Sequence, residues 1–140
     1  MFAALDISSS ALVAQRMRLV TVAGNLANLS SLRDENGQVR PYQARYVVFQ
    51  TDPSVGGSTG ASGVKVAAIQ TENMEPEYRY DPGHPLAIRS GPWKGYVAYP
   101  RVDMMAEMVD ALEATRSYEA NVGVMELTRN MAMQTLRILG

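Results

Sequence analysis

His84 is the only histidine of the chain and the side chain best suited to acid–base chemistry, within the segment Asp81-Pro82-Gly83-His84-Pro85. Paired with Asp81, it could act as an acid–base couple. No serine or cysteine in a nucleophile context accompanies it, and a metal site would require several more ligands. The prolines around it favour the alternative, a histidine fixed in a turn, so we predict no catalytic residue and no metal site.

Two other groups of residues could suggest ligand chemistry, and both have a plainer interpretation. The glycines between 56 and 63 lack the Gly-x-x-x-x-Gly-Lys-Ser/Thr pattern of a phosphate-binding loop, so we interpret 52–63 as a flexible Gly/Ser-rich tip. The nine methionines could form a metal or cofactor box, but methionine also fills irregular protein–protein contacts. The absence of cysteine excludes disulfides and thiolate metal sites. We therefore expect no cofactor.

The elements that must position these residues are indicated by apolar residues in alternating steps of four and three at both ends of the chain. This spacing keeps side chains on one side of an α-helix. The N-terminal stripe is Met1, Leu5, Ser8, Leu12, Gln15, Leu19, Val22, Leu26 and Leu29. The C-terminal stripe is Met104, Met108, Ala111, Thr115, Tyr118, Val122, Met125, Arg129, Ala132, Leu136 and Leu139.

The C-terminal stripe is unusually long for a chain of 140 residues. No proline interrupts 103–139, so one helix of ~55 Å is allowed at about 1.5 Å per residue. The average helix of a globular domain has only ~11 residues. The stripe therefore needs the other terminal helix, other copies of the chain, or both to cover it.

The middle of the chain predicts a small β unit. Segments 44–51 and 64–69 are rich in β-forming residues, and 77–80 and 96–99 could be two further short strands. Residues 30–43 predict a loop, and the prolines and glycines of 81–95 predict an irregular segment. The expected fold class is mainly α with a small β insert. Helices 4–29 and 103–139 pair as an antiparallel coiled coil, so the domains are 1–29 with 101–140, and 30–100 between them.

Local signals mark the predicted helices. Asp103 is a good N-cap, and Asp6 is placed in the first turn of the first helix, where an acid suits the helix dipole. Gly24 costs ~1 kcal/mol relative to alanine and would let another backbone approach. The polar stripe residues Ser8, Gln15, Thr115 and Arg129 lie at exposed edges or, alternatively, are buried and fix the register. A buried Arg129 would need an acid or carbonyl partner.

The charges exclude several classes of partner. The net charge is −1, with 13 basic and 14 acidic residues interspersed, so no field recruits nucleic acid or anionic lipid. No apolar run approaches the ~18 residues of a membrane span, so we expect no membrane insertion. Asp6, Arg16 and Arg18 break the pattern of a Sec signal. If the protein leaves the cytoplasm, another export route must recognise it.

The terminal residues also carry a resemblance to a known family. Gln15-Arg16 followed by Ala23-Gly24-Asn25-Leu26-Ala27-Asn28 resembles the N-terminal signature of the flagellar rod and hook (axial) proteins. Glu107-Met108 and the segment 114–121 (ATRSYEAN) resemble their C-terminal signature. The segments VVFQ (47–50), GVKV (63–66), DPGHPLA (81–87) and GYV (95–97), with the short length, are similar to the proximal-rod type. Leu29-Ser30-Ser31 and Arg101 depart from the family pattern.

The resemblance implies a structural subunit of the bacterial flagellar basal-body rod and not an enzyme. It implies polymerisation through the terminal helices, as the inner core of a periplasmic helical tube that transmits motor torque. Its partners would be further copies, other axial rod proteins, base components of the basal body and the flagellar type III export apparatus. The predicted subunit contacts are Leu5, Leu12, Gln15, Leu19, Val22, Asn25, Leu26, Asn28, Met104, Met108, Ala111, Thr115, Tyr118, Asn121, Val122, Met125, Arg129, Ala132, Leu136 and Leu139.

Two alternatives stay open. The amides of Asn25, Asn28 and Asn121 are predicted to hydrogen-bond backbone at subunit contacts, whereas capping of a local helix end is the other interpretation. The rival function is a coiled-coil adaptor that forms a small oligomer and binds a partner through its central β unit. An enzyme would need a polar pocket around His84.

Overall fold

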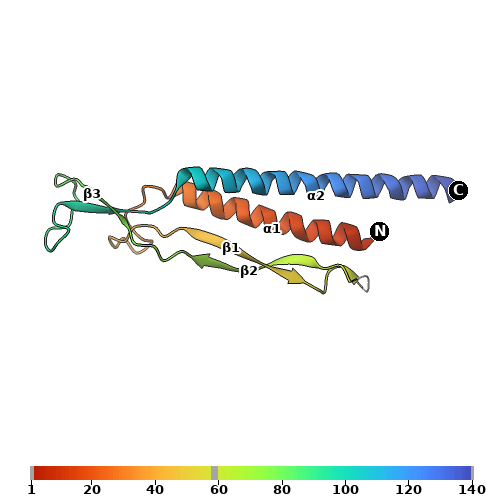
Figure 1. Cartoon of the computed structure of the whole chain (residues 1–140), viewed down its shortest axis with the longest axis horizontal. Helices are drawn as coiled ribbons and strands as arrows, with labels where there is room; N and C mark the ends of the chain where they lie inside the picture. The colour runs from red at the N-terminus through yellow and green to blue at the C-terminus, as the bar shows by residue number, and fades with distance from the viewer. Residues whose placement is uncertain (1, 58–59, 140) are drawn as a thin grey trace.

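A computed structural model describes residues 2–57 and 60–139. The elements follow in the order α1 (Phe2–Ala27), β1 (Arg45–Asp52), β2 (Gly63–Thr71), β3 (Glu77–Tyr80), β4 (Tyr96–Tyr99) and α2 (Met104–Leu139). In Figure 1, α1 lies between α2 and the β1–β2 hairpin, and the two helices run in opposite directions. The expected fold class, mainly α with paired antiparallel terminal helices and a small β insert, is confirmed.

The helix ends follow local capping chemistry. At the start of α2, the carboxylate of Asp103 accepts hydrogen bonds from the backbone N–H of Met105 (2.9 Å) and Ala106 (3.2 Å), as an N-cap does. The first helix begins at Phe2 and not at residue 4, so its first turn holds no acidic residue. The prediction that Asp6 lies in that first turn is therefore wrong, because the apolar residues before Asp6 already form the helix.

Small and polar side chains fill the interface between α1 and α2. On α2, Ala114 is 0 % exposed and Thr128 is buried. On α1, Ala14 and Val22 are buried. Small residues let two helix backbones approach closely, which leaves the larger apolar side chains of α2 on its other sides.

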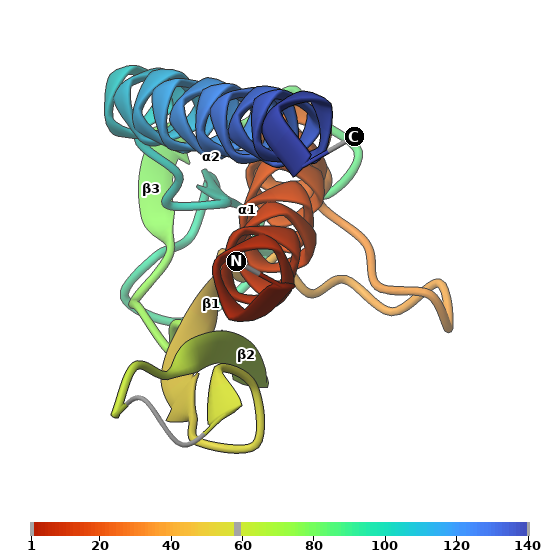
Figure 2. The same ribbon diagram turned by 90° about the vertical axis from the view of Figure 1, so that its right-hand side faces the viewer.

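The β1–β2 hairpin packs on α1 on the side away from α2 (Figures 1 and 2). Its antiparallel register shifts between Val48 and Phe49, which is a β-bulge. The Ser10 hydroxyl of α1 accepts a hydrogen bond from the Val64 N–H (3.1 Å). A Cβ on Gly63 would lie 2.8 Å from that hydroxyl oxygen, so the close approach of hairpin and helix requires glycine there.

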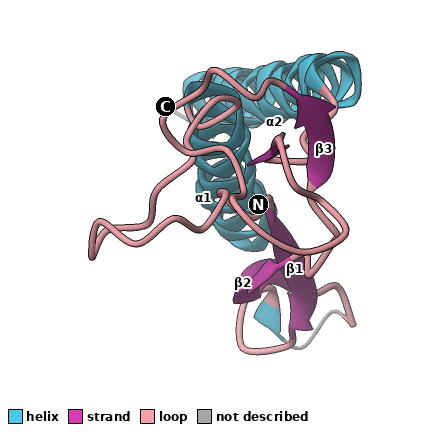
Figure 3. Cartoon of the chain, turned by 90° about the vertical axis from the view of Figure 1, so that its left-hand side faces the viewer, coloured by secondary structure: helices cyan, strands magenta, loops and turns pink. Residues whose placement is uncertain are grey.

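Strands β3 and β4 form a second small hairpin beyond the end of the helix pair (Figures 1 and 3). Val97 is buried, and the rings of Tyr78 and Trp93 stack with centroids 4.2 Å apart. Within the irregular segment 81–95, Nδ1 of His84 accepts a hydrogen bond from the Leu86 N–H (3.1 Å). His84 is therefore used to hold the turn.

The loop between α1 and β1 extends sideways from the rest of the chain (Figures 2 and 3). The Asp34 carboxylate accepts hydrogen bonds from the N–H groups of Asn36 (3.0 Å) and Gln38 (2.9 Å), and Gly37 has φ of 75°. Gly24, expected to admit another backbone, has no atom of another described segment within 4 Å of the place of a Cβ, so no such approach occurs among the described residues.

Candidate assembly surface

Asn25, the first asparagine of the N-terminal signature, joins three segments of the chain. Its side chain is 1 % exposed. Its Nδ2 donates to the Arg45 carbonyl (2.8 Å) and to Oε1 of Glu107 (3.0 Å). Its Oδ1 accepts from the Tyr42 hydroxyl and the Arg45 N–H, both at 2.9 Å. The amide thereby fixes the C-terminal end of α1 to the start of β1 and to the first turns of α2.

Within the subunit, each of the signature asparagines forms hydrogen bonds with its own chain. Asn25 has no hydrogen-bonding capacity left for another subunit, so we remove it from the predicted contact set. The amide of Asn28 donates to the Gly24 carbonyl (2.8 Å) and accepts from the Ser31 hydroxyl (2.8 Å), which matches the alternative of helix-end capping. Asn121 donates to the Ser117 carbonyl of its own helix (2.8 Å).

Two further residues of α1, Arg18 and Gln15, make polar contacts with α2. Arg18 of α1 pairs with Asp110 and with Glu113 (3.3 Å) of α2. Nε2 of Gln15 donates to the Ser117 hydroxyl (3.2 Å), while Oε1 of Gln15 is buried with no hydrogen-bond partner in the described part of the chain. All these contacts lie in the half of the helix pair that is nearest the start of β1.

The same polar end shifts the pKa values of ionisable groups, among them Glu107 and Tyr42. Burial raises the pKa of Glu107, and Asp110, Glu72 and Asp103 add to this, whereas the hydrogen bond from Asn25 opposes it. Burial also raises the pKa of Tyr42, so its hydroxyl stays protonated and donates to Asn25.

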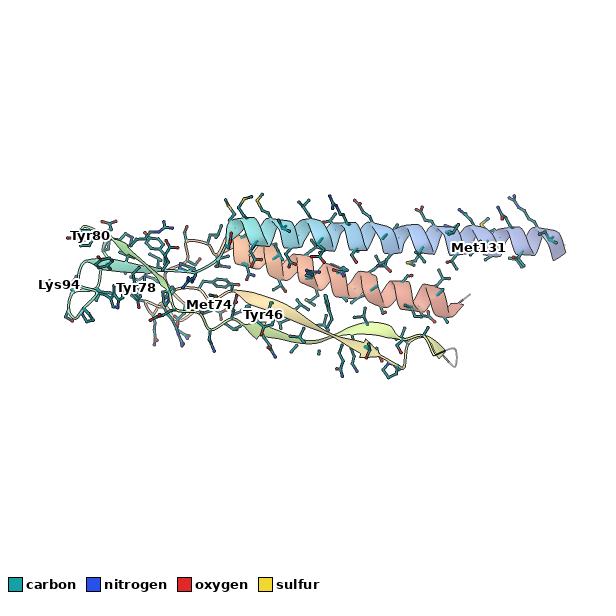
Figure 4. All side chains as sticks on the ribbon, viewed as in Figure 1. Tyr46, Met74, Tyr78, Tyr80, Lys94 and Met131 are labelled. Carbon is teal, nitrogen blue, oxygen red and sulfur yellow. The ribbon has the colours of Figure 1, made fainter. Side chains whose placement is uncertain are left out.

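Large apolar side chains are exposed along most of α2, among them Met131, which Figure 4 labels in the C-terminal part of the helix. The exposed ones are Met104, Met105, Met108, Val109, Leu112, Tyr118, Val124, Leu127, Met131, Met133, Leu136 and Ile138. Soluble monomers seldom expose apolar surface of this extent, and where they do it marks an interaction site.

The predicted contact residues divide by exposure. Those buried or half-buried by their own chain are Leu5, Leu12, Gln15, Leu19, Val22, Asn25, Leu26, Asn28, Ala111, Asn121, Val122, Met125 and Ala132. The exposed ones are Met104, Met108, Thr115, Tyr118, Arg129 and Leu136. The side chain of Leu139 lies outside the described residues. Thr115 and Arg129 are exposed in this subunit, which matches the exposed-edge alternative. The guanidinium of Arg129 is therefore not buried and needs no acid or carbonyl partner within the subunit.

Sequence reasoning missed part of the apolar surface and most of the Asn25 contacts. Met105 and Leu112, and then Val124, Leu127, Met131 and Ile138, lie off the predicted stripe. Their spacing of three, four and seven residues was a visible signal for a second stripe. Tyr42 and Arg45 carried no such signal, since they lie in a loop and at a strand start.

The described residues hold no group of histidines and carboxylates that could bind a metal ion. None of the described helices is long and apolar enough to cross a membrane. Beside His84 lies a depression of about 330 Å³, lined by Arg89, Lys94 and mostly apolar neighbours.

Comparison with known proteins finds flagellar basal-body rod proteins that are similar over nearly the whole chain. A family model described as flagellar basal body rod FlgEFG protein C-terminal matches residues 94–138. The flagellar basal-body rod protein FlgC of Salmonella typhimurium strain LT2 is 44% identical over 133 residues, which cover 95% of this chain and 93% of that protein. The FlgC proteins of Bacillus subtilis strain 168 (40% over 149 residues, 98% and 97% covered) and Borreliella burgdorferi (34% over 150 residues, 99% and 97% covered) are similar over nearly their whole lengths.

The fold and these relatives define a structural component of the flagellar basal-body rod, located in the basal body, and not an enzyme. Within that class, the chain belongs to the FlgC family of flagellar basal-body rod proteins.

Proposed function

We propose that this chain is a subunit of the proximal rod that polymerises through its terminal helices into a helical tube, and that the tube transmits motor torque across the periplasm. One observation carries the proposal. The α1–α2 interface uses small and polar side chains, while the large apolar side chains of α2 face outward. A subunit built in this way leaves its main apolar surface for its neighbours.

The apolar surface is distributed as assembly requires. A helix in a protein gains most of its stability from the packing of its apolar face against other elements. α2 exposes apolar side chains on more than one side, so one neighbouring helix, α1, cannot cover it. We therefore retain as proposed contacts the exposed and half-buried members of the predicted set, from Leu5 to Leu136, without the buried Val22 and Asn25.

The proposed partners are further copies, other axial rod proteins and base components of the basal body. The axial contact is head-to-tail, since contacts between unlike surfaces that do not close generate open helical assemblies. We also propose export through the flagellar type III apparatus, supported by the similarity to flagellar basal-body rod proteins.

A single substitution tests assembly separately from folding. Val122 is half-buried on the proposed contact face, and Val122→Asp would place a carboxylate without a partner between subunits, at a cost of several kcal/mol. We expect normal protein levels and helix content, no incorporation into basal bodies and non-motile cells. Ser62→Asp, at an exposed position near the hairpin tip, is the matched control and should swim normally.

Normal motility of cells that carry only the Val122→Asp chain would overturn the proposed contact face. Sedimentation separates the rival function, because an adaptor forms a fixed small oligomer. A rod subunit gives a monomer or an open-ended polymer.

A further inference from the structure

The depression of about 330 Å³ beside His84 lies in the irregular segment between β3 and β4. The charged side chains that line it are Arg89 and Lys94, which are exposed and form no ion pair within the described part of the chain. The described residues that line it include no carboxylate, and Asp81, the acid closest in sequence, is not one of them. Figure 4 labels Lys94 at the end of the molecule opposite to Met131. The depression therefore presents positive charge that the subunit does not neutralise by an ion pair.

The two cationic residues are brought together by backbone hydrogen bonds. The Ile88 N–H donates to the Tyr96 carbonyl, and the Gly95 N–H donates to the Ile88 carbonyl, both at 2.9 Å. Arg89 directly follows Ile88 in the chain. Lys94 directly precedes Gly95, so the same bonds place both cationic residues at one depression.

His84 adds a third donor to the lining. Its Nδ1 accepts a hydrogen bond from the Leu86 N–H (3.1 Å), and an imidazole nitrogen accepts only when it carries no proton. In the neutral ring the proton is then on Nε2. This Nε2–H has no hydrogen-bond partner among residues 2–57 and 60–139. The lining therefore offers three donor side chains for a negatively charged group.

The backbone around the depression favours a carboxylate over a phosphate. Phosphate sites are often built from free backbone N–H groups, at helix N-termini or in nests. Here the two lining prolines have no N–H, and the N–H groups of His84, Ala87, Ile88, Lys94 and Gly95 already donate to carbonyls of the subunit. Side chains are therefore the main free donors. A guanidinium can bind a carboxylate through two parallel hydrogen bonds, and the apolar lining suits the methylene groups of an acidic side chain.

We propose that the depression beside His84 binds a carboxylate of a partner protein, presented by an acidic side chain of an exposed segment. Arg89 and Lys94 supply the positive charge, and the Nε2–H of His84 supplies a further hydrogen bond. The site uses no residue of either terminal helix, so it goes beyond the proposed polymerisation. Because both cations are exposed, binding weakens as the salt concentration rises.

The composition of the chain provides two reporters at this site. His84 is the only histidine, and Trp93, next to Lys94, is the only tryptophan. The full chain is titrated at low salt with short blocked peptides that carry two adjacent glutamates, two glutamines or one phosphoserine. The first and the last have nearly the same charge. Imidazole NMR signals and tryptophan fluorescence are recorded. We expect saturable shifts of both signals with the diglutamate peptide, none with the diglutamine peptide, and weaker binding of the phosphoserine peptide.

The test variant carries Arg89→Gln and Lys94→Gln, and the control variant carries Arg40→Gln and Lys65→Gln. Both pairs are exposed and remove the same charge, but the control residues do not line the depression. The test variant should bind the diglutamate peptide about tenfold more weakly, whereas the control variant should stay within a factor of about two of the wild-type chain. Thermal unfolding of both variants should stay close to that of the wild-type chain, because these side chains are exposed.

Each of three results would overturn the inference. The absence of a saturable shift with the diglutamate peptide would mean that the depression binds no carboxylate. Equal weakening in the two variants would mean that only the net charge of the chain attracts the peptide. Binding of the phosphoserine peptide as tight as that of the diglutamate peptide would assign the depression to phosphate. These results do not bear on polymerisation, which the Val122→Asp test addresses separately.

Discussion

Replacing Asn25 with alanine removes the joint between α1, the start of β1 and α2. The side chain makes four hydrogen bonds at 2.8–3.0 Å while 1 % exposed. At a net ~1 kcal/mol for each bond, the loss is about 4 kcal/mol. Tyr42 and Glu107 are only half-buried and can bond to water instead, which reduces the cost to about 3 kcal/mol.

The assay is reversible thermal unfolding of the purified subunit, followed by circular dichroism. For a chain of this size each kcal/mol moves the midpoint by roughly 3 °C, so Asn25→Ala should unfold about 10 °C below the wild-type chain. Asn36→Ala is the matched control. The described contact of Asn36 is made by its backbone N–H, which alanine keeps, so this change should stay within about 0.5 kcal/mol.

Asn25→Asp sharpens the test. It keeps an acceptor for Tyr42 and for the Arg45 N–H but places a carboxylate beside Glu107, so it should be less stable at neutral pH than at acidic pH. An Asn25→Ala midpoint within a degree or two of the wild type would refute the reasoning, because it would mean that the four bonds contribute nothing net.

The remaining predictions concern pH and the free ends of the helices. The raised pKa of Glu107 means that the folded chain holds this proton more tightly than the unfolded chain, so the contribution to stability is present below the ordinary glutamate pKa and is lost as pH rises through the folded pKa. Glu107→Gln keeps the acceptor for Asn25, so the free energy of unfolding, measured with urea, should fall less with rising pH in this variant than in the wild-type chain. An equal pH dependence of this free energy in the two chains would contradict the prediction. Brief trypsin treatment of the isolated subunit should cut after Arg137 and Arg129 before Arg116, because the described polar contacts between the helices end at Gln15 and Ser117. Earlier cleavage at Arg116 would contradict this order.

Local signals were enough to predict the elements and their order. The absence of proline from 103–139, the cap at Asp103 and the β-rich segments act over a few residues, and the observed helices and strands match them closely. The antiparallel pairing followed because the central unit returns the chain. The flagellar signature likewise indicated the family, which the relatives confirm.

The sequence by itself determined two long terminal helices, a small β unit between them and the family, because helix period, capping and turn chemistry are local. It did not determine which side of α2 meets α1. Apolar residues occur on several sides of that helix, and close packing selected small ones such as Ala114 and Thr128. The role of Asn25 was also decided only by the tertiary structure. Its partners Tyr42, Arg45 and Glu107 come from segments far apart in the chain, and a buried amide is stable only where folding brings such groups together.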